Sequence, residues 1–150
     1  MPDDRPVFRQ SIDATHEEVR SALSGMIRAM SPLELSQEES GSVELVVAEA
    51  LNNIVEHAYV GVKPGRIDIS VVAACDGLHC CLRDSGSPMP DGRPPIGAYA
   101  GPAPVLDDQP EGGFGWFLIR SLARELDYRR ADDQNVLTFR IAVRGHSAAA

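Results

Sequence analysis

The sequence predicts a single α/β (α+β) domain over residues 1–150, because helical and strand patterns are interleaved along the chain. Apolar side chains between Val43 and Tyr59 recur at the spacing of an amphipathic helix, and from Arg66 the apolar period changes to two, which is typical of strands. A chain of this length forms one ordinary domain and buries about 68 to 70% of its unfolded surface.

Composition and charge exclude several classes of protein. Hydrophobic residues make up 43% and charged residues 24%, which disfavours a disordered chain or a fibrous repeat. A net charge of -8 without a basic cluster disfavours direct binding to nucleic acid. We expect a cytoplasmic protein without membrane contact, because MPDDRPVFRQ lacks a signal pattern and no apolar run approaches the roughly 18 residues of a membrane span.

The cysteines Cys75, Cys80 and Cys81 lie close together, beside His79. Metal binding is disfavoured, because the spacing is not that of a CxxC pair and neighbours on a strand point to opposite faces. We expect the three cysteines to be buried as small hydrophobic side chains.

The first half of the chain is predicted to hold a strand and two helices. Val7 to Ile12 is an edge-strand candidate. Thr15 and the glutamate three residues later form a capping-box signature, so a helix should follow and end at Ser31-Pro32. The central helix is predicted from Val43 to Tyr59, with residues 37–42 leading into it.

The second half is predicted to begin with a hairpin. The alternating run from Arg66 meets Asp76-Gly77, a two-residue turn favoured in hairpins, and Leu78 to Arg83 returns as the antiparallel partner. Residues 85–112 are rich in Pro and Gly and lack periodicity, which is typical of a lid or binding loop.

A third helix and two strands are predicted to complete the domain. The helix should run from Gly113 to Leu126, and the strands from Tyr128 to Ala131 and from Val136 to Val143, joined by a turn at Asp132 to Asn135. We expect residues 145–150 to be frayed. The predicted apolar face of the helix consists of Phe117, Leu118, Leu122 and Leu126.

A polar stripe follows the border of the central helix's apolar face. Glu49, Asn53 and His57 are spaced i, i+4, i+8, so they should lie one above another and be partly buried. Burying such groups without partners costs about 1 to 3 kcal/mol, which suggests a ligand or ion. A helix flank hydrogen-bonded to a neighbouring loop explains the stripe equally well.

Two further motifs flank the predicted lid. Asp84-Ser85-Gly86 holds a carboxylate at a strand end, although an Asp before a Gly is also a common turn. Gly112-Gly113-Phe114-Gly115 opens a helix, where backbone N–H groups can bind phosphate, although it also suits a hinge. The glycines do not fit a P-loop, which needs a Lys and a Ser or Thr after them. Nor do they fit a Rossmann fingerprint, because no parallel βαβ unit surrounds them.

The order of these motifs resembles that of the GHKL ATPases, which include gyrase, MutL and histidine kinases. EALNNIVEHAY is similar to their N box, DSG and GGFGWFLIRSL to their two glycine boxes, and NVLTF to their final strand. The resemblance runs from about Val43 to Ile141. It implies a two-layer sandwich, with about three helices on one face of a mixed, mostly antiparallel sheet and ATP between the central helix and the lid.

The match is most similar to the small stand-alone anti-sigma-factor serine/threonine kinases. Pro88 follows Ser87 where many relatives have a second glycine, which agrees with this subset rather than with most histidine kinases. The chain also lacks a phospho-acceptor His helix and a sensor or receiver segment, so a complete histidine kinase is excluded, although a severed ATPase domain is not.

The resemblance assigns roles to the polar stripe. Asn53 falls on the asparagine that ligates Mg²⁺, and Glu49 on the glutamate that acts as general base or orients the nucleophile. His57 falls at a nucleotide-site position whose role is less defined. An amide oxygen suits Mg²⁺, and a carboxylate one helical turn away can accept a proton from an attacking hydroxyl.

The resemblance also assigns the base and phosphate contacts. Asp84 falls on the aspartate that accepts from the exocyclic amine of adenine, and Gly86 lets the base approach. Gly113 and Gly115 match glycines beside the phosphates, and Thr138 lies where a Ser or Thr often supports the adenine-binding Asp.

The function implied is that of an ATP- and Mg²⁺-dependent protein serine/threonine kinase. Its implied partners are a STAS-type anti-anti-sigma protein as substrate and a sigma factor or other response regulator as the alternative partner, and a homodimer is compatible with the resemblance. The alternative is a non-catalytic ATP-binding module that switches between partners. Glu49 favours the kinase, because a pure binder does not need a base.

Overall fold

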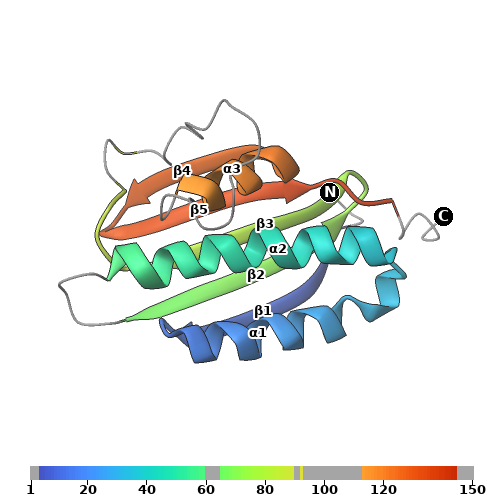
Figure 1. The fold of residues 1–150 in the computed structure, drawn as a ribbon, viewed down its shortest axis with the longest axis horizontal. Helices are drawn as coiled ribbons and strands as arrows, with labels where there is room; N and C mark the ends of the chain where they lie inside the picture. The colour runs from blue at the N-terminus through green and yellow to red at the C-terminus, as the bar shows by residue number, and fades with distance from the viewer. Residues whose placement is uncertain (1–3, 60–64, 90–91, 93–112, 145–150) are drawn as a thin grey trace.

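The computed structural model describes residues 4–59, 65–89, 92 and 113–144. Within these residues five strands form one sheet in the order β1-β2-β3-β5-β4, and all their pairings are antiparallel. The helices cover one face of this sheet (Figure 1), which confirms the two-layer sandwich. The strands are β1 (Arg5–Asp13), β2 (Arg66–Ala74), β3 (Gly77–Asp84), β4 (Arg124–Ala131) and β5 (Gln134–Ile141). The helices are α1 (His16–Ala29), α2 (Gln37–Asn53) and α3 (Gly113–Leu122), with a 3-10 turn η1 (Ser31–Leu33) and a π-helical segment η2 (Ile54–Ala58).

The predicted start and end of α1 are confirmed. The Thr15 side chain accepts a hydrogen bond from the Glu18 N–H at 3.1 Å and caps the helix. The chain leaves α1 through η1, where Pro32 is compatible with the first turn of a helix but not with the interior of α1.

The central helix begins earlier than predicted. Ser36 is its N-cap, and Ser36 and Glu39 form a reciprocal capping box with both hydrogen bonds at 3.0 Å. Residues 37–42 therefore belong to α2 rather than leading into it. At Asn53 the helix changes to the π-helical η2, whose wider turn breaks the i, i+4 alignment beyond that residue.

Two further boundaries in the second half differ from the prediction. Ala74 pairs with Gly77, so the hairpin turn is Cys75-Asp76, one residue earlier than predicted, and Gly77 opens β3 with a φ of 131°. The last turn is Asp132-Asp133, where both residues have positive φ. Gln134 and Asn135 therefore lie on β5 rather than in the turn.

The predicted apolar face of the third helix is confirmed only in part. Leu122 packs against the core, but the helix ends there and Leu126 lies on β4. The most deeply buried side chains of α3 and the next residue are Trp116, Ile119 and Ala123, at the i, i+3, i+7 spacing of a helix packed on a sheet.

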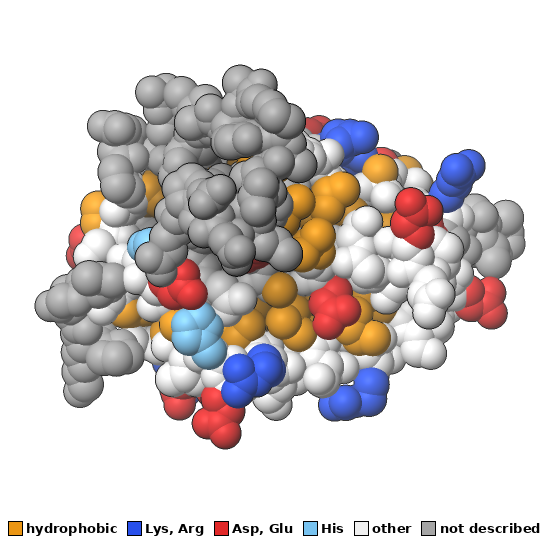
Figure 2. All heavy atoms as spheres, viewed as in Figure 1, with side chains coloured by type: hydrophobic (Ala, Val, Ile, Leu, Met, Phe, Trp, Pro, Cys, Tyr) orange, Lys and Arg blue, Asp and Glu red, His pale blue; other side chains and the backbone are white. Residues whose placement is uncertain are grey.

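The core lies between the helices and the sheet. Alternate side chains of β2, β3 and β5 are buried against it, including Ile67, Leu82 and Phe139, and fully burying an aliphatic or aromatic side chain contributes about 1.5 to 3 kcal/mol. Figure 2, drawn from the helix side, shows hydrophobic side chains between interspersed acidic and basic ones. No helix in the described ranges is long and apolar enough to span a membrane.

Candidate functional site

The C-terminal part of α2 carries two polar side chains at the edge of the core. Asn53 is buried, with 9% of its surface exposed, and its Nδ2 donates to the Glu49 backbone oxygen at 2.8 Å. This bond fixes the amide, so Oδ1 is the end left to accept, and none of the described residues donates to it. A buried acceptor without a donor suits a cation or a ligand.

Glu49 lies one turn before Asn53 and is half-buried. Burial raises the pKa of its carboxyl, and the negative charge of Glu56 raises it further. No described residue donates a hydrogen bond to the Glu49 carboxylate. A carboxylate in this state is a better proton acceptor than a fully solvated one.

The start of α3 packs against these two side chains. Gly113 is the first residue of the helix, as predicted, so backbone N–H groups of its first turn lack partners within the helix. A Cβ on Gly115 would lie 3.3 Å from Asn53 Nδ2 and 3.5 Å from Glu49 Oε2. Glu49, Asn53 and the N-terminal turn of α3 therefore form one cluster.

His57 does not continue the polar stripe as predicted. It lies on η2 and is exposed, so the expected partial burial was wrong for this residue. The π-helical turn rotates it away from the line of Glu49 and Asn53.

Asp84, the last residue of β3, is almost fully buried, with 4% of its surface exposed. Its Oδ1 accepts from the Gly86 N–H and from Asn135 Nδ2, both at 2.8 Å. Oδ2 receives no hydrogen bond from the described residues. Burial raises the pKa of Asp84, while the Asn135 and Gly86 hydrogen bonds and the charge of Arg130 act in the opposite direction.

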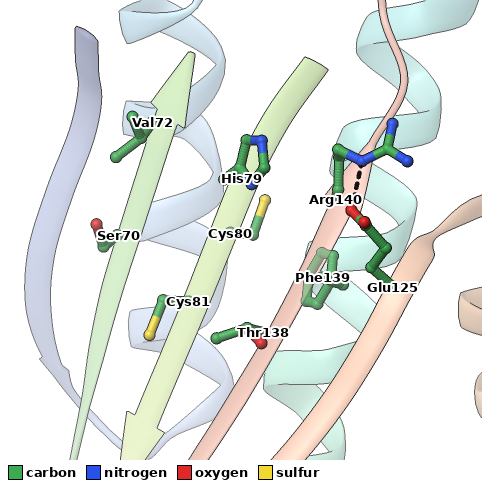
Figure 3. A pocket seen from close by; sticks show the side chains of 9 residues that line it. All are labelled: Ser70, Val72, His79, Cys80, Cys81, Glu125, Thr138, Phe139 and Arg140. Carbon is green, nitrogen blue, oxygen red and sulfur yellow. Dashed lines mark hydrogen bonds and ion pairs between the residues drawn. The ribbon is translucent and has the colours of Figure 1, made fainter. Parts of the chain in front are cut away.

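The residue that supports Asp84 is Asn135, and the prediction of Thr138 in this role was wrong. Asn135 pairs with Asp84 across β3 and β5 and is buried on the helix side. Thr138 instead pairs with Cys81 and lines a cavity of about 350 Å³ on the sheet face away from the helices (Figure 3). The side-chain period of two puts positions 135 and 138 on opposite faces.

The turn after Asp84 packs on the end of η2. A Cβ on Gly86 would lie 2.4 Å from the Ala58 carbonyl oxygen, so only glycine fits. Ser87 N–H donates to the same oxygen at 2.6 Å. The Tyr59 hydroxyl accepts from the Ser85 N–H at 3.0 Å and donates to the Arg66 carbonyl at 2.9 Å. Gly86 thus contacts η2 directly, a constraint that the sequence did not reveal.

The cysteines face different surroundings. Cys80 is buried in the core, Cys81 is half-buried on the opposite sheet face, and Cys75 is exposed in the hairpin turn. The described residues hold no group of three or more His, Cys, Asp and Glu side chains suited to a metal ion.

Comparison with known proteins identifies the family. Residues 12–141 match the family of histidine kinase-like ATPase domains. The chain belongs to this family. Membership of an ATPase domain family implies that the chain binds ATP.

Curated relatives in this family include two kinds of kinase. The serine-protein kinase RsbW of Bacillus licheniformis is 29% identical over 110 residues, which cover 72% of this chain and 66% of that protein. The serine/threonine-protein kinase BtrW of Bordetella bronchiseptica is 33% identical over 100 residues, which cover 65% and 66%. The chain thus spans just under two thirds of the length of these relatives.

A solved structure shares the fold. The histidine kinase domain from the Erythrobacter litoralis EL346 blue-light activated histidine kinase has a TM-score of 0.52 at 16% identity, covering 87% of this chain and 63% of that one.

Proposed function

We propose that this protein is an ATP-dependent serine/threonine-protein kinase and an anti-sigma-factor-type regulator. Its substrate is a STAS-type antagonist protein, and its alternative partner is a sigma factor or a similar regulator. The observation that carries the proposal is the half-buried carboxylate of Glu49, which lies against the start of α3 and one turn from Asn53, whose Oδ1 receives no hydrogen bond from the described residues. The naming of the relatives as serine kinases supports the same reaction.

The two ends of the site suit the two ends of ATP. Oδ2 of Asp84 can accept from the exocyclic amine of adenine, because Oδ1 is already occupied. The phosphates would lie toward the first turn of α3, which begins at Gly113 and contains Gly115, because the helix dipole there favours negative charge. His57, which is exposed on η2, stays a proposed nucleotide-site residue.

The donor set also fits Mg²⁺. Asn53 Oδ1 is a neutral hard oxygen to which no described residue donates a hydrogen bond. Mg²⁺ is commonly held by one or two protein oxygens together with phosphates and water. When bound, Mg²⁺ neutralises charge on the phosphates. Glu49 is not needed as a metal ligand in this arrangement and remains free to accept a proton.

The proposed reaction transfers the γ-phosphoryl group to a Ser or Thr hydroxyl. A bond forms between the hydroxyl oxygen and the γ-phosphorus, the bond to the β–γ bridging oxygen breaks, and ADP leaves. Glu49 accepts the hydroxyl proton or orients the hydroxyl for attack. Its raised pKa, caused mainly by burial, increases its proton affinity.

Replacing Glu49 by Gln tests the proposal. We expect Glu49→Gln to bind Mg-ATP like the wild type and to lose phosphoryl transfer to a STAS-domain protein from the same genome by roughly 100-fold or more. Isothermal calorimetry measures binding, and labelled ATP measures transfer. Glu44→Gln is the matched control, because Glu44 lies exposed on the same helix.

The possible outcomes separate the kinase from the alternative switch. Equal transfer by Glu49→Gln and wild type would remove Glu49 from the mechanism. Tight Mg-ATP binding without transfer to any STAS-domain protein of that genome would favour a non-catalytic ATP-gated module. If ATP does not bind, both proposals are contradicted. Thermal unfolding is a second check on binding, since a ligand at 100 times its Kd should stabilise the fold by about 2.7 kcal/mol.

A further inference from the structure

Two side chains of β4 reach the Asp84 corner although neither belongs to the nucleotide motifs. Arg130 donates from one guanidinium nitrogen to the Gly86 carbonyl at 2.7 Å and to Asn135 Oδ1 at 3.0 Å. The Tyr128 hydroxyl donates to the same Asn135 oxygen and accepts the Met89 N–H at 2.9 Å. β4 therefore contacts both the support of Asp84 and the chain that follows it.

These contacts use the hydrogen-bonding capacity of Asn135 at both ends. Its Nδ2 donates to Asp84 Oδ1 at 2.8 Å and to the Ser87 carbonyl at 2.9 Å. Its Oδ1 accepts from Tyr128 and Arg130. A flipped amide would bring donors against donors at one end and acceptors against acceptors at the other, so the orientation of Asn135 is fixed.

We propose that Arg130 is a positioning residue for base recognition, which acts through Asn135 and the Gly86 carbonyl so that Asp84 presents only Oδ2 to the base amine. The inference rests on the proposed nucleotide site. It extends that site to β4. Among the described residues, loss of Arg130 leaves Asn135 Oδ1 with Tyr128 as its remaining donor. The Gly86 carbonyl then keeps only the long 3.5 Å contact from Asn135 Nδ2 as a side-chain hydrogen bond.

Charge gives Arg130 a second effect on the same atom. Oδ1 of Asp84 already accepts from Gly86 and Asn135, so a proton would settle on Oδ2 and turn it into a donor facing the donor amine of adenine. Base recognition therefore requires ionised Asp84. Among the described residues, the groups that face Asp84 are the cation Arg130, the neutral donors of Gly86 and Asn135, and the Tyr59 hydroxyl, whose pKa Asp84 helps to raise.

Burial raises the pKa of Asp84 and the charge of Arg130 lowers it. Replacing Arg130 by a neutral residue should therefore raise the pH below which ADP affinity is lost. Arg130 is exposed to solvent, so screening makes this shift modest.

The experiment compares ADP with inosine diphosphate, which carries a carbonyl oxygen in place of the adenine amine. Calorimetry without Mg²⁺ over a range of pH isolates the base end of the site. We expect the wild type to prefer ADP, and Arg130→Met to lose roughly tenfold in ADP affinity with little change for inosine diphosphate. The pH below which ADP affinity falls should also be higher in this variant than in the wild type.

Three further variants separate charge, hydrogen bond and fold. Arg130→Lys keeps the charge and should restore the wild-type pH dependence. Tyr128→Phe removes a hydroxyl without changing charge, so it should weaken the ADP preference without moving the pH dependence. Arg129→Met is the control, because that neighbouring side chain pairs with Asp127 at 3.7 Å and is 73% exposed.

The outcomes distinguish this inference from the proposed function. If the wild type binds neither nucleotide, the proposed site itself is wrong. If the wild type prefers ADP and Arg130→Met keeps both that preference and the pH dependence, the positioning role is overturned while the site stands. An equal loss of both nucleotides at every pH would also overturn it, because that pattern indicates a general structural effect.

Discussion

The two ends of the site are built differently. At the proposed base end, Asp84 is almost fully buried and accepts a hydrogen bond from Asn135 Nδ2, while Asn135 Oδ1 is itself held by Tyr128 and Arg130. At the proposed phosphate end, the hydrogen bond that the described residues give Asn53 lies within its own helix, and none of them donates to the Glu49 carboxylate. The base end is therefore preorganised by the protein, whereas the phosphate end holds acceptors that a cation and a substrate hydroxyl can satisfy.

Two glycines show the same contrast. A side chain at Gly86 would meet the backbone carbonyl of Ala58 at 2.4 Å, and backbone cannot move without disturbing η2. A side chain at Gly115 would meet the ends of Asn53 and Glu49, at 3.3 and 3.5 Å, and these ends can shift. The first position is constrained by the fold and the second by the ligand site.

The largest effect is expected at Gly86. Gly86→Ala should destabilise the protein by about 3 kcal/mol or more, because the added methyl group overlaps backbone. Urea unfolding measures the change. Gly41→Ala is the matched control: a Cβ there meets nothing within 4 Å on an exposed stretch of α2, so the same change should stabilise by up to about 1 kcal/mol. A loss below 1 kcal/mol at Gly86 would show that this corner yields easily.

Asp84→Asn should separate binding from stability at the base end. The new Oδ1 still accepts from Gly86 and Asn135, but an NH₂ group then faces the adenine amine. We expect adenine nucleotide affinity to fall roughly 10- to 100-fold, the range for a hydrogen bond to a charged group. Calorimetry measures the loss, and the wild type with inosine diphosphate is its internal reference.

The same variant tests the pKa of Asp84 through stability. The pKa of Asp84 is raised in the folded state, so its contribution to stability is fully present below the unfolded pKa and is lost as pH rises through the folded pKa. Without ligand, the stability of Asp84→Asn relative to the wild type should therefore increase as pH rises from acidic to neutral. If the wild type instead becomes more stable relative to Asp84→Asn over this range, the hydrogen bonds and Arg130 outweigh burial.

Sequence reasoning found most of the elements because these depend on local patterns. Periodicity located α1, α2 and the β2–β3 hairpin, and the motif order indicated the family that the comparison then showed. The change to η2 at Ile54 is not visible as a pattern, because helical and π-helical turns bury similar side chains. The exposure of His57 therefore could not be anticipated.

The support of Asp84 was missed for a different reason. Assigning Asn135 to a turn removed it from the sheet, whereas the pairing of Asp84 with Asn135 depends on a register set by the two-residue turn Asp132-Asp133. A short polar strand start gives little local signal for such a register. The contributions of Tyr128 and Arg130 arise from the position of β4 in the sheet and likewise have no sequence motif.

The smallest effect is expected from Gly115→Ala. Alanine favours helix formation over glycine by up to about 1 kcal/mol, and the tight contact with Asn53 offsets part of this gain, so stability should change by less than about 1 kcal/mol. Displacement of the Asn53 amide by a few tenths of an ångström should still disturb a magnesium ligand. We therefore expect Mg-ATP affinity to fall by roughly threefold to tenfold, while ADP binding without Mg²⁺ stays unchanged, since Asp84 is not affected.

Thermal unfolding and calorimetry with and without Mg²⁺ measure the two effects, and Asn53→Ala with the same ligands shows the full magnesium-dependent contribution. A destabilisation as large as that of Gly86→Ala would contradict the contrast between the two ends, because the start of α3 would then be as rigid as the Asp84 corner.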